Sequence, residues 1–171
     1  MNKHICAGLA VVAVLVGCSP SGSRKGMPAQ AEGPPVSLGE PGNATDVAVT
    51  VRSVEEKRRF APAGMGPEAG PAETFVIVRY AIKNTSRKPL SSVDRPAVTL
   101  VDGNGQGYSE DSQTSIVASG INNDIQDALA DINPNVSAKV TAVWKVDKAA
   151  FDRATWKLRV ATEPQLTFAL K

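Results

Sequence analysis

Apolar and polar residues alternate with a period of two through most of the chain after residue 46. Val47, Val49 and Val51 share one face of residues 46–54, and Arg52 lies on the other face. This alternation is typical of a β-strand that buries one face. The same alternation, or a short apolar run, predicts further strands at residues 74–84, 97–101, 106–109, 139–146, 155–162 and 166–170.

In one segment the apolar residues change to a helical period. Ile121, Ile125, Leu129 and Ile132 follow one another at intervals of three or four residues. We expect a short helix over residues 121–132, laid across one end of the strands. About seven short strands with one helical segment predict an all-β fold, an antiparallel β-sandwich.

The N-terminus carries a third pattern, a basic start followed by an uncharged, mostly apolar run from Ile5 to Val16. A membrane-spanning helix needs roughly 20 apolar residues, whereas the apolar core of a secretion signal has about 7–15. We therefore expect residues 1–17 to be a signal peptide rather than a membrane-spanning helix.

Residues 15–18, Leu-Val-Gly-Cys, resemble the lipobox of bacterial lipoproteins. The resemblance implies cleavage between Gly17 and Cys18, a diacylglycerol thioether on the Cys18 sulfur and an acyl chain on its new amino group. Two or more acyl chains anchor a protein stably, which predicts a cell-membrane lipoprotein. Ser19 stands where an Asp would resemble the inner-membrane retention signal, so in a bacterium with two membranes we expect the outer membrane. The alternatives are an ordinary signal peptide with a chance cysteine, or an anchor helix.

The composition changes again after the cysteine. Glycine and proline are frequent in residues 19–43, and no residue of that segment is aromatic. Such a segment buries too little apolar surface to offset the entropy lost on ordering. We expect residues 18–43 to form the lipidated end and a flexible linker, and residues 44–171 to form one domain with its own core.

Several turn and packing motifs follow one another in this domain. They are Phe75-Val76-Ile77-Val78, Ile82-Lys83-Asn84-Thr85-Ser86, Lys88-Pro89-Leu90, Leu100-Val101-Asp102 with Gly105 and Tyr108, and Ile132-Asn133-Pro134 before Trp144. Their order resembles the telokin-like, immunoglobulin-related domain of bacterial lipoproteins and secreted antigens. Asn135 replaces the glycine that this family has after the proline. The resemblance implies an immunoglobulin-like β-sandwich and supplies no catalytic residue.

The composition also excludes several kinds of chemistry. The single histidine, His4, and Cys6 lie in the expected signal, and lipid would occupy the sulfur of Cys18. The mature chain would then have neither imidazole nor free thiol, which excludes Ser-His-Asp and Cys-His catalysis and conventional zinc or blue-copper sites. No carboxylate pair stands in a catalytic motif, so we expect no enzyme activity and no cofactor. Trp144 and Trp156 lie on the apolar faces of their strands, which favours core packing over a ligand platform.

One glycine-rich turn, residues 102–111, is a candidate for calcium binding. Asp102 and Asn104 stand at the first and third positions of a calcium loop, and Asp111 follows at its exit. Gln113 stands where such a loop needs a bidentate Glu. The alternative is an ordinary glycine-rich hairpin turn with an acidic exit.

A long loop, residues 55–73, follows the first predicted strand. Its candidates for contact with a partner protein are a basic pair and two apolar residues: Arg58, Arg59, Phe60 and Met65. The alternative is a solvated charge cluster on a mobile loop.

Together, these features predict a lipid-anchored cell-envelope protein that acts as a non-enzymatic protein-interaction module. Its partners would be the membrane, through acyl chains on Cys18, and an envelope protein. A formal net charge of +2 offers no basic field for nucleic acid. The alternative function is small-ligand or calcium binding in the envelope through the turn from Asp102 to Asp111.

Overall fold

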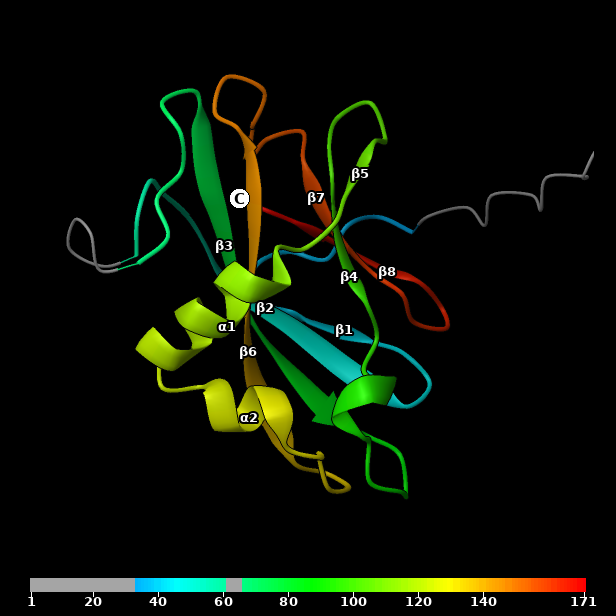
Figure 1. Cartoon of the computed structure of the whole chain (residues 1–171). Helices are drawn as coiled ribbons and strands as arrows, with labels where there is room; N and C mark the ends of the chain where they lie inside the picture. The colour runs from blue at the N-terminus through cyan, green and yellow to red at the C-terminus, as the bar shows by residue number, and fades with distance from the viewer. Residues whose placement is uncertain (1–32, 61–65) are drawn as a thin grey trace, which may run out of the picture. The chain divides into compact units, whose positions relative to one another are not determined.

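Two four-stranded antiparallel sheets make up the fold (Figure 1). The computed structural model describes residues 33–60 and 66–171. The first sheet has the strand order β1-β2-β3-β6, and the second has the order β5-β4-β7-β8. The bounds are β1 Pro41–Asn43, β2 Val47–Lys57, β3 Glu73–Asn84, β4 Val98–Val101, β5 Gly107–Tyr108, β6 Ser137–Asp147, β7 Lys157–Val160 and β8 Leu166–Ala169. The predicted all-β sandwich is confirmed.

The apolar faces of the predicted strands form the core between the sheets. In β2, Val47, Val49 and Val51 are buried, as their alternation predicted. The pairing of β2 with β3 shifts register just after Val51, and Val54 is therefore buried although it stands three residues later. The two tryptophans also lie in this core, as predicted: Trp144 and Trp156.

A second, smaller apolar cluster lies on the outer face of the first sheet. Phe75 and Ile77 point away from the main core and pack with Val143 of β6 and Ala118. Ala118 belongs to α1 (Ser112–Ile121), which lies against β6. Because β3 is buried on both faces, its sequence is a nearly continuous apolar run rather than a strict alternation.

The helical segment differs from the single helix predicted over residues 121–132. The chain forms α1 and a separate short helix, α2 (Ile125–Leu129), with Asn123 between them at a left-handed φ of 58°. Ile132 is not helical and pairs with Leu90 in an isolated bridge. The apolar pattern missed α1 because the buried face of this helix consists of small residues: Thr114, Ser115, Ala118 and Ser119.

The folded part of the chain begins earlier than Ala44, where the sequence placed the end of the linker. The backbone N–H of Val36 donates to the Thr167 carbonyl at 2.8 Å, and its own carbonyl accepts from the Ala169 N–H at 2.9 Å. Val36 thus extends the edge of the second sheet at β8, whereas β1 pairs with β2 in the first. Residues 36–43 therefore cross from one sheet to the other. Backbone pairing at an edge leaves no alternation in the sequence, so the pattern missed this segment.

Gly42 in β1 is expected to tolerate no side chain. A Cβ at this position would lie 2.8 Å from Cζ of Phe168, whose ring is fully buried. We expect Gly42→Ala to lower the free energy of unfolding by about 1–3 kcal/mol through overpacking, as measured by urea denaturation. Gly33→Ala is the matched control, because a Cβ there meets open space. Equal losses in the two variants would contradict this account of the crossing segment.

Candidate functional site

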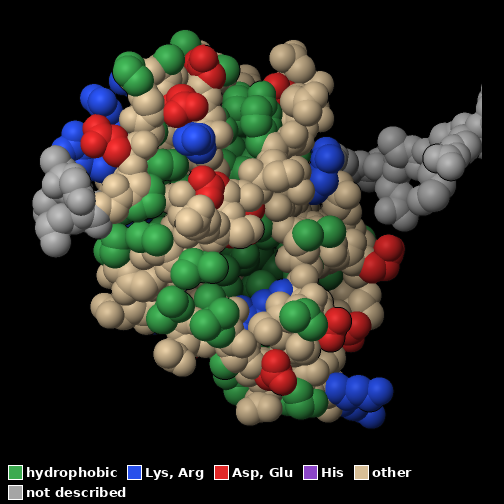
Figure 2. All heavy atoms as spheres, viewed as in Figure 1, with side chains coloured by type: hydrophobic (Ala, Val, Ile, Leu, Met, Phe, Trp, Pro, Cys, Tyr) green, Lys and Arg blue, Asp and Glu red, His purple; other side chains and the backbone are tan. Residues whose placement is uncertain are grey.

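Exposed large apolar side chains are concentrated on the two helices. The described residues include six such side chains, of which four lie on α1 or α2, whereas Val93 lies in a short 3-10 helix before β4 and Val136 in the turn before β6. The six side chains are Val93, Ile116, Val117, Ile121, Leu129 and Val136. Figure 2 shows hydrophobic side chains over the face that carries α1 and α2. Because gathered exposed apolar surface often marks an interaction site, this face is the first candidate for binding.

A groove of about 210 Å³ opens on this face between α1, α2 and β6. Its apolar walls include Ile116 from α1, Leu129 from α2 and Val140 from β6. Ile116 and Leu129 are 56% and 64% exposed. Figure 2 shows this face hollowed, with hydrophobic side chains inside the hollow. A cavity of about 150 Å³ holds benzene, so this groove has room for one large side chain or a small ligand.

Polar contacts to the edge of β6 hold both helices beside the groove. The Asp111 N–H donates to the Val143 carbonyl at 2.8 Å, and Ser115 Oγ accepts from the Val143 N–H at 2.9 Å. Asp127 Oδ2, from α2, accepts from the Lys139 N–H at 3.0 Å. The helices therefore satisfy backbone groups that an uncovered edge strand would leave unpaired.

Two ionisable side chains line the groove, Arg95 and Glu110. The Arg95 guanidinium donates to the carbonyls of Asp127, Ala128 and Ala130 at the C-terminal end of α2. Burial lowers the pKa of Arg95. Arg95 thus mainly links the segment before β4 to the end of α2 by hydrogen bonds.

Glu110 is the second of these groups. Burial raises the pKa of its carboxyl, a hydrogen bond from Ser115 acts in the opposite direction, and the neighbouring Asp111 charge raises it further. Tyr80, in the core, has its phenol pKa raised by burial first and then by the Glu110 charge. Ionisable groups with shifted pKa values in a cleft are typical of functional sites, although ion pairs in ordinary structure also shift them.

Glu55 of β2 shows the opposite shift, away from the groove. Its carboxylate lies 2.8 Å from Lys57 Nζ and also accepts from Arg79 Nη1. These contacts lower the pKa of Glu55, and the hydrogen bond with Lys57 is the larger cause.

Glu110→Gln and Glu55→Gln are expected to change the free energy of unfolding in opposite directions at neutral pH. A carboxyl whose pKa is raised by folding destabilises the fold above that pKa, and the penalty disappears as the pH falls through it. A carboxyl whose pKa is lowered stabilises the fold above its unfolded pKa, and this contribution is lost as the pH falls through the folded pKa. Urea denaturation from about pH 3 to 8 measures this. At neutral pH the free energy of unfolding should be higher than that of the natural chain for Glu110→Gln, and lower by about 0–1 kcal/mol for Glu55→Gln. A loss in both variants would contradict the raised pKa of Glu110.

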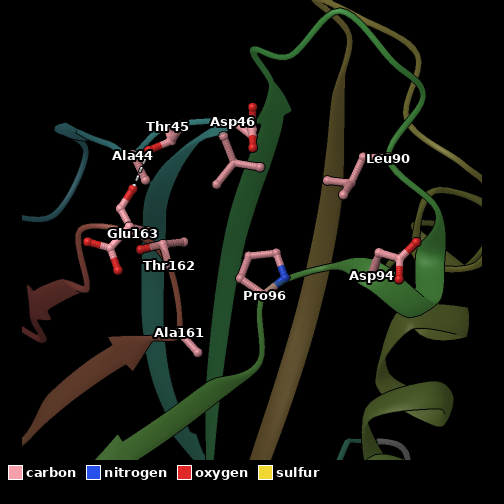
Figure 3. Close-up of a pocket in the computed structure, with 10 residues that line it drawn as sticks. Ala44, Thr45, Asp46, Leu90, Asp94, Pro96, Ala161, Thr162 and Glu163 are labelled. Carbon is pink, nitrogen blue, oxygen red and sulfur yellow. Dashed lines mark hydrogen bonds between the residues drawn. The ribbon is translucent and has the colours of Figure 1, made fainter.

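A second crevice, of about 220 Å³, lies at one end of the sandwich (Figure 3). The N–H and Oγ of Thr45 both donate to the Glu163 carbonyl, at 2.9 and 2.8 Å, and join two of its walls. The carboxylates of Asp46, Asp94 and Glu163 come from three segments and do not converge in Figure 3. The helical groove is the stronger candidate, because it combines exposed apolar walls with ionisable groups of shifted pKa.

The residues of the candidate calcium turn have separate structural roles. Asp102 Oδ1 accepts from the backbone N–H groups of Asn104 and Gln106, at 2.9 and 2.8 Å. Asp111 is the N-cap of α1, where its Oδ1 accepts from the Thr114 N–H at 3.0 Å. Within residues 33–60 and 66–171, no three His, Cys, Asp or Glu side chains lie close enough together to hold a metal ion.

Calcium is therefore expected to leave the melting temperature unchanged. A ligand present at 100 times its Kd adds about 2.7 kcal/mol to the free energy of unfolding, which is readily seen as a shift in Tm. Thermal unfolding of the full chain with and without millimolar calcium, and with magnesium as the control, measures this directly. A rise of several degrees with calcium alone would contradict the structural roles of Asp102 and Asp111.

The loop candidates for partner contact are partly engaged within the protein. They are Arg58, Arg59, Phe60 and Met65, of which Met65 lies outside the described residues. The two arginines lie 3.2 and 2.9 Å from one oxygen of Glu68, and the Phe60 ring centroid lies 5.0 Å from that of Phe75. Partner contact through this loop stays a prediction.

The expected membrane anchor, Cys18, and the expected signal peptide also lie outside the described residues. In the part of the chain that the structure describes, no helix is long and apolar enough to cross a membrane.

Known proteins resemble this chain in sequence and in fold. Residues 36–165 match the family described as Domain of unknown function (DUF4352). The uncharacterized protein YxkC of Bacillus subtilis (strain 168) is 34% identical over 128 residues, which are 74% of this chain and 71% of that protein. The crystal structure of a conserved hypothetical protein from Bacillus anthracis matches with a TM-score of 0.66 at 20% identity, and the match covers 79% of this chain and 94% of that protein. The structure of an uncharacterized β-sandwich protein from Clostridium difficile 630 matches with a TM-score of 0.53 at 14% identity, and the match covers 85% of this chain and 100% of that protein.

Proposed function

The chain belongs to the DUF4352 family of domains of unknown function, and we propose that it is a lipid-anchored, non-enzymatic protein-interaction module of the cell envelope. The lipobox resemblance at residues 15–18 supports the anchor, which would be acyl chains on Cys18. In a bacterium with two membranes the anchor would lie in the outer one. The exposed apolar side chains of the two helices, Ile116, Val117, Ile121 and Leu129, carry the binding role.

This face has the makeup of a protein interface. Such interfaces have an apolar centre, where a few buried side chains contribute most of the binding energy, and a polar rim. Ile116 and Leu129 would form the centre beside the groove, and the carboxylates of Asp111, Asp127 and Asp131 would belong to the rim. Burying the apolar part contributes about 25 cal/mol for each Å² removed from water.

Crosslinking in the native envelope, followed by mass spectrometry, tests this proposal. We expect one enriched protein adduct with the natural chain, and at least about a fivefold loss of it for the double variant Ile116→Ser, Leu129→Ser. Glu40→Ser is the control, because Glu40 is exposed just before β1, at the edge of the first sheet opposite β6, on which both helices pack. Recovery of the chain without any enriched partner, or an adduct that the double variant keeps, would count against the proposal.

A further inference from the structure

The groove between α1, α2 and β6 contains a carboxylate that has no cationic partner within the described residues. Glu110 lines the groove, and none of the salt bridges of that part of the chain includes it. Its one polar side-chain neighbour that lowers the pKa is the Ser115 hydroxyl. Because buried charges in proteins are as a rule paired, a partly buried carboxylate of this kind favours a cation supplied from outside.

The remaining walls of the groove suit the stem of a long cationic side chain. Ile116, Ile125, Leu129 and Val140 are aliphatic, and they lie along the same groove as Glu110. Lysine and arginine combine an aliphatic stem, which packs on apolar surface, with a cationic head that needs a polar partner. The volume of about 210 Å³ accommodates one such side chain.

The charge around the groove favours the same class of ligand. Between Arg95 and Lys139 the chain has six Asp or Glu residues and no Lys or Arg. This segment includes both helices and the turns that flank them. Asp124 is buried and Asp102 lies in the turn between β4 and β5, whereas Arg79 and Lys139 border the helices. The excess of carboxylates along the helices themselves favours cationic partners over anionic lipid headgroups, and therefore a basic protein segment over a membrane surface.

The two terminal nitrogens of Arg95, the cation of the groove itself, are already engaged. Its guanidinium donates to three carbonyls at the end of α2. Burial lowers the pKa of Arg95, and the nearby carboxylates of Asp127 and Asp131 act in the opposite direction. The Arg95 Nε is buried without a hydrogen-bond partner among the described residues, and none of their salt bridges joins Arg95 to Glu110.

We propose that the groove binds one lysine or arginine side chain of the partner protein, with its aliphatic stem along Ile116 and Leu129 and its cationic head at the Glu110 carboxylate. This rests on the proposed function, because it names the chemistry by which the interaction module would recognise its partner. Glu110 would then be the residue that selects a basic anchor over an uncharged one.

Peptides that differ in one side chain test the proposal. The probes are four pentapeptides, blocked at both ends, in which glycines flank a central lysine, arginine, norleucine or glutamate. The full chain in phosphatidylcholine nanodiscs, with labelled isoleucine methyl groups, reports binding by NMR at Ile116 and Ile125, while buried Ile77 and Ile82 serve as internal controls. We expect the lysine and arginine peptides to shift the two groove methyls in a saturable way. The norleucine peptide should bind about tenfold more weakly, because it has the same stem without the charge, and the glutamate peptide should not bind.

Variants then assign the effect to the groove. Glu110→Gln should lower the affinity for the lysine peptide to that for norleucine, and Ile116→Ser should weaken both, whereas Glu163→Gln at the other crevice should change neither. Equal binding of lysine and norleucine, no shift with any peptide, or shifts caused by phosphatidylglycerol vesicles alone would each overturn the proposal. A crosslinked envelope partner that depends on Ile116 and Leu129 would still support the interaction module in those cases, so the two proposals fail separately.

Discussion

Replacing Asn84 by alanine is expected to lower the free energy of unfolding by about 3–5 kcal/mol, a large part of the stability of a domain of this size. Asn84 ends β3 and is fully buried. Its Nδ2 donates to the carbonyls of Lys88 and Ile132, both at 2.7 Å, and its Oδ1 accepts from the Ser86 N–H at 2.9 Å and the Ser86 hydroxyl at 2.8 Å. One side chain thus joins the end of β3, the turn after it and the chain that leads into β6.

The cost arises from the groups that lose Asn84 as a partner. Each buried donor or acceptor left without a hydrogen bond costs about 1–3 kcal/mol. Asn84→Asp should be about as unstable as Asn84→Ala, because a carboxylate accepts from Ser86 but cannot donate to the two carbonyls. Urea denaturation measures both, and Asn104→Ala, at an exposed turn position, is the control. A loss below about 1 kcal/mol for Asn84→Ala would contradict the role given to these hydrogen bonds.

Cys18→Ser is expected to move the protein from the membrane fraction to the soluble fraction. Each CH₂ of an acyl chain buried in a bilayer contributes about 0.8 kcal/mol, so losing all chains removes an anchor of many kcal/mol. Fractionation with intact-mass measurement shows both the location and the acylation. Cys6→Ser, in the expected signal peptide, is the matched control and should leave both unchanged. A Cys18→Ser protein that stays in the membrane fraction and is equally acylated would contradict the anchor.

The strands were predictable because one physical rule determines their pattern. A strand with one buried face alternates, and Val47, Val49 and Val51 do so strictly. The rule does not predict a segment that is held in place by other interactions. Small residues form the buried face of α1, and backbone hydrogen bonds at a sheet edge place Val36, so neither segment showed an apolar period. The telokin-like, immunoglobulin-related resemblance stays a prediction beyond the sandwich fold.

The helical groove was not predictable from the sequence, because distant segments form it. Arg95 precedes β4, Glu110 follows β5, and Val140 lies in β6, so only the folded chain brings them together. One signal was present in the sequence: Ile116 and Val117 stand among small polar residues, with no basic residue between Arg95 and Lys139. Those two apolar residues are exposed, whereas isoleucine and valine are usually buried.

Site-specific photo-crosslinking in living cells tests the central claim, that the α1–α2 face binds a protein, most directly. A photoreactive phenylalanine analogue would replace Ile116, Leu129 or Glu40 in the full chain, one position at a time. We predict a covalent adduct with the same envelope protein from positions 116 and 129, and none from position 40, which lies beside β1 at the sheet edge opposite β6. Adducts that form equally well from position 40, or no adduct from positions 116 and 129, would contradict the claim.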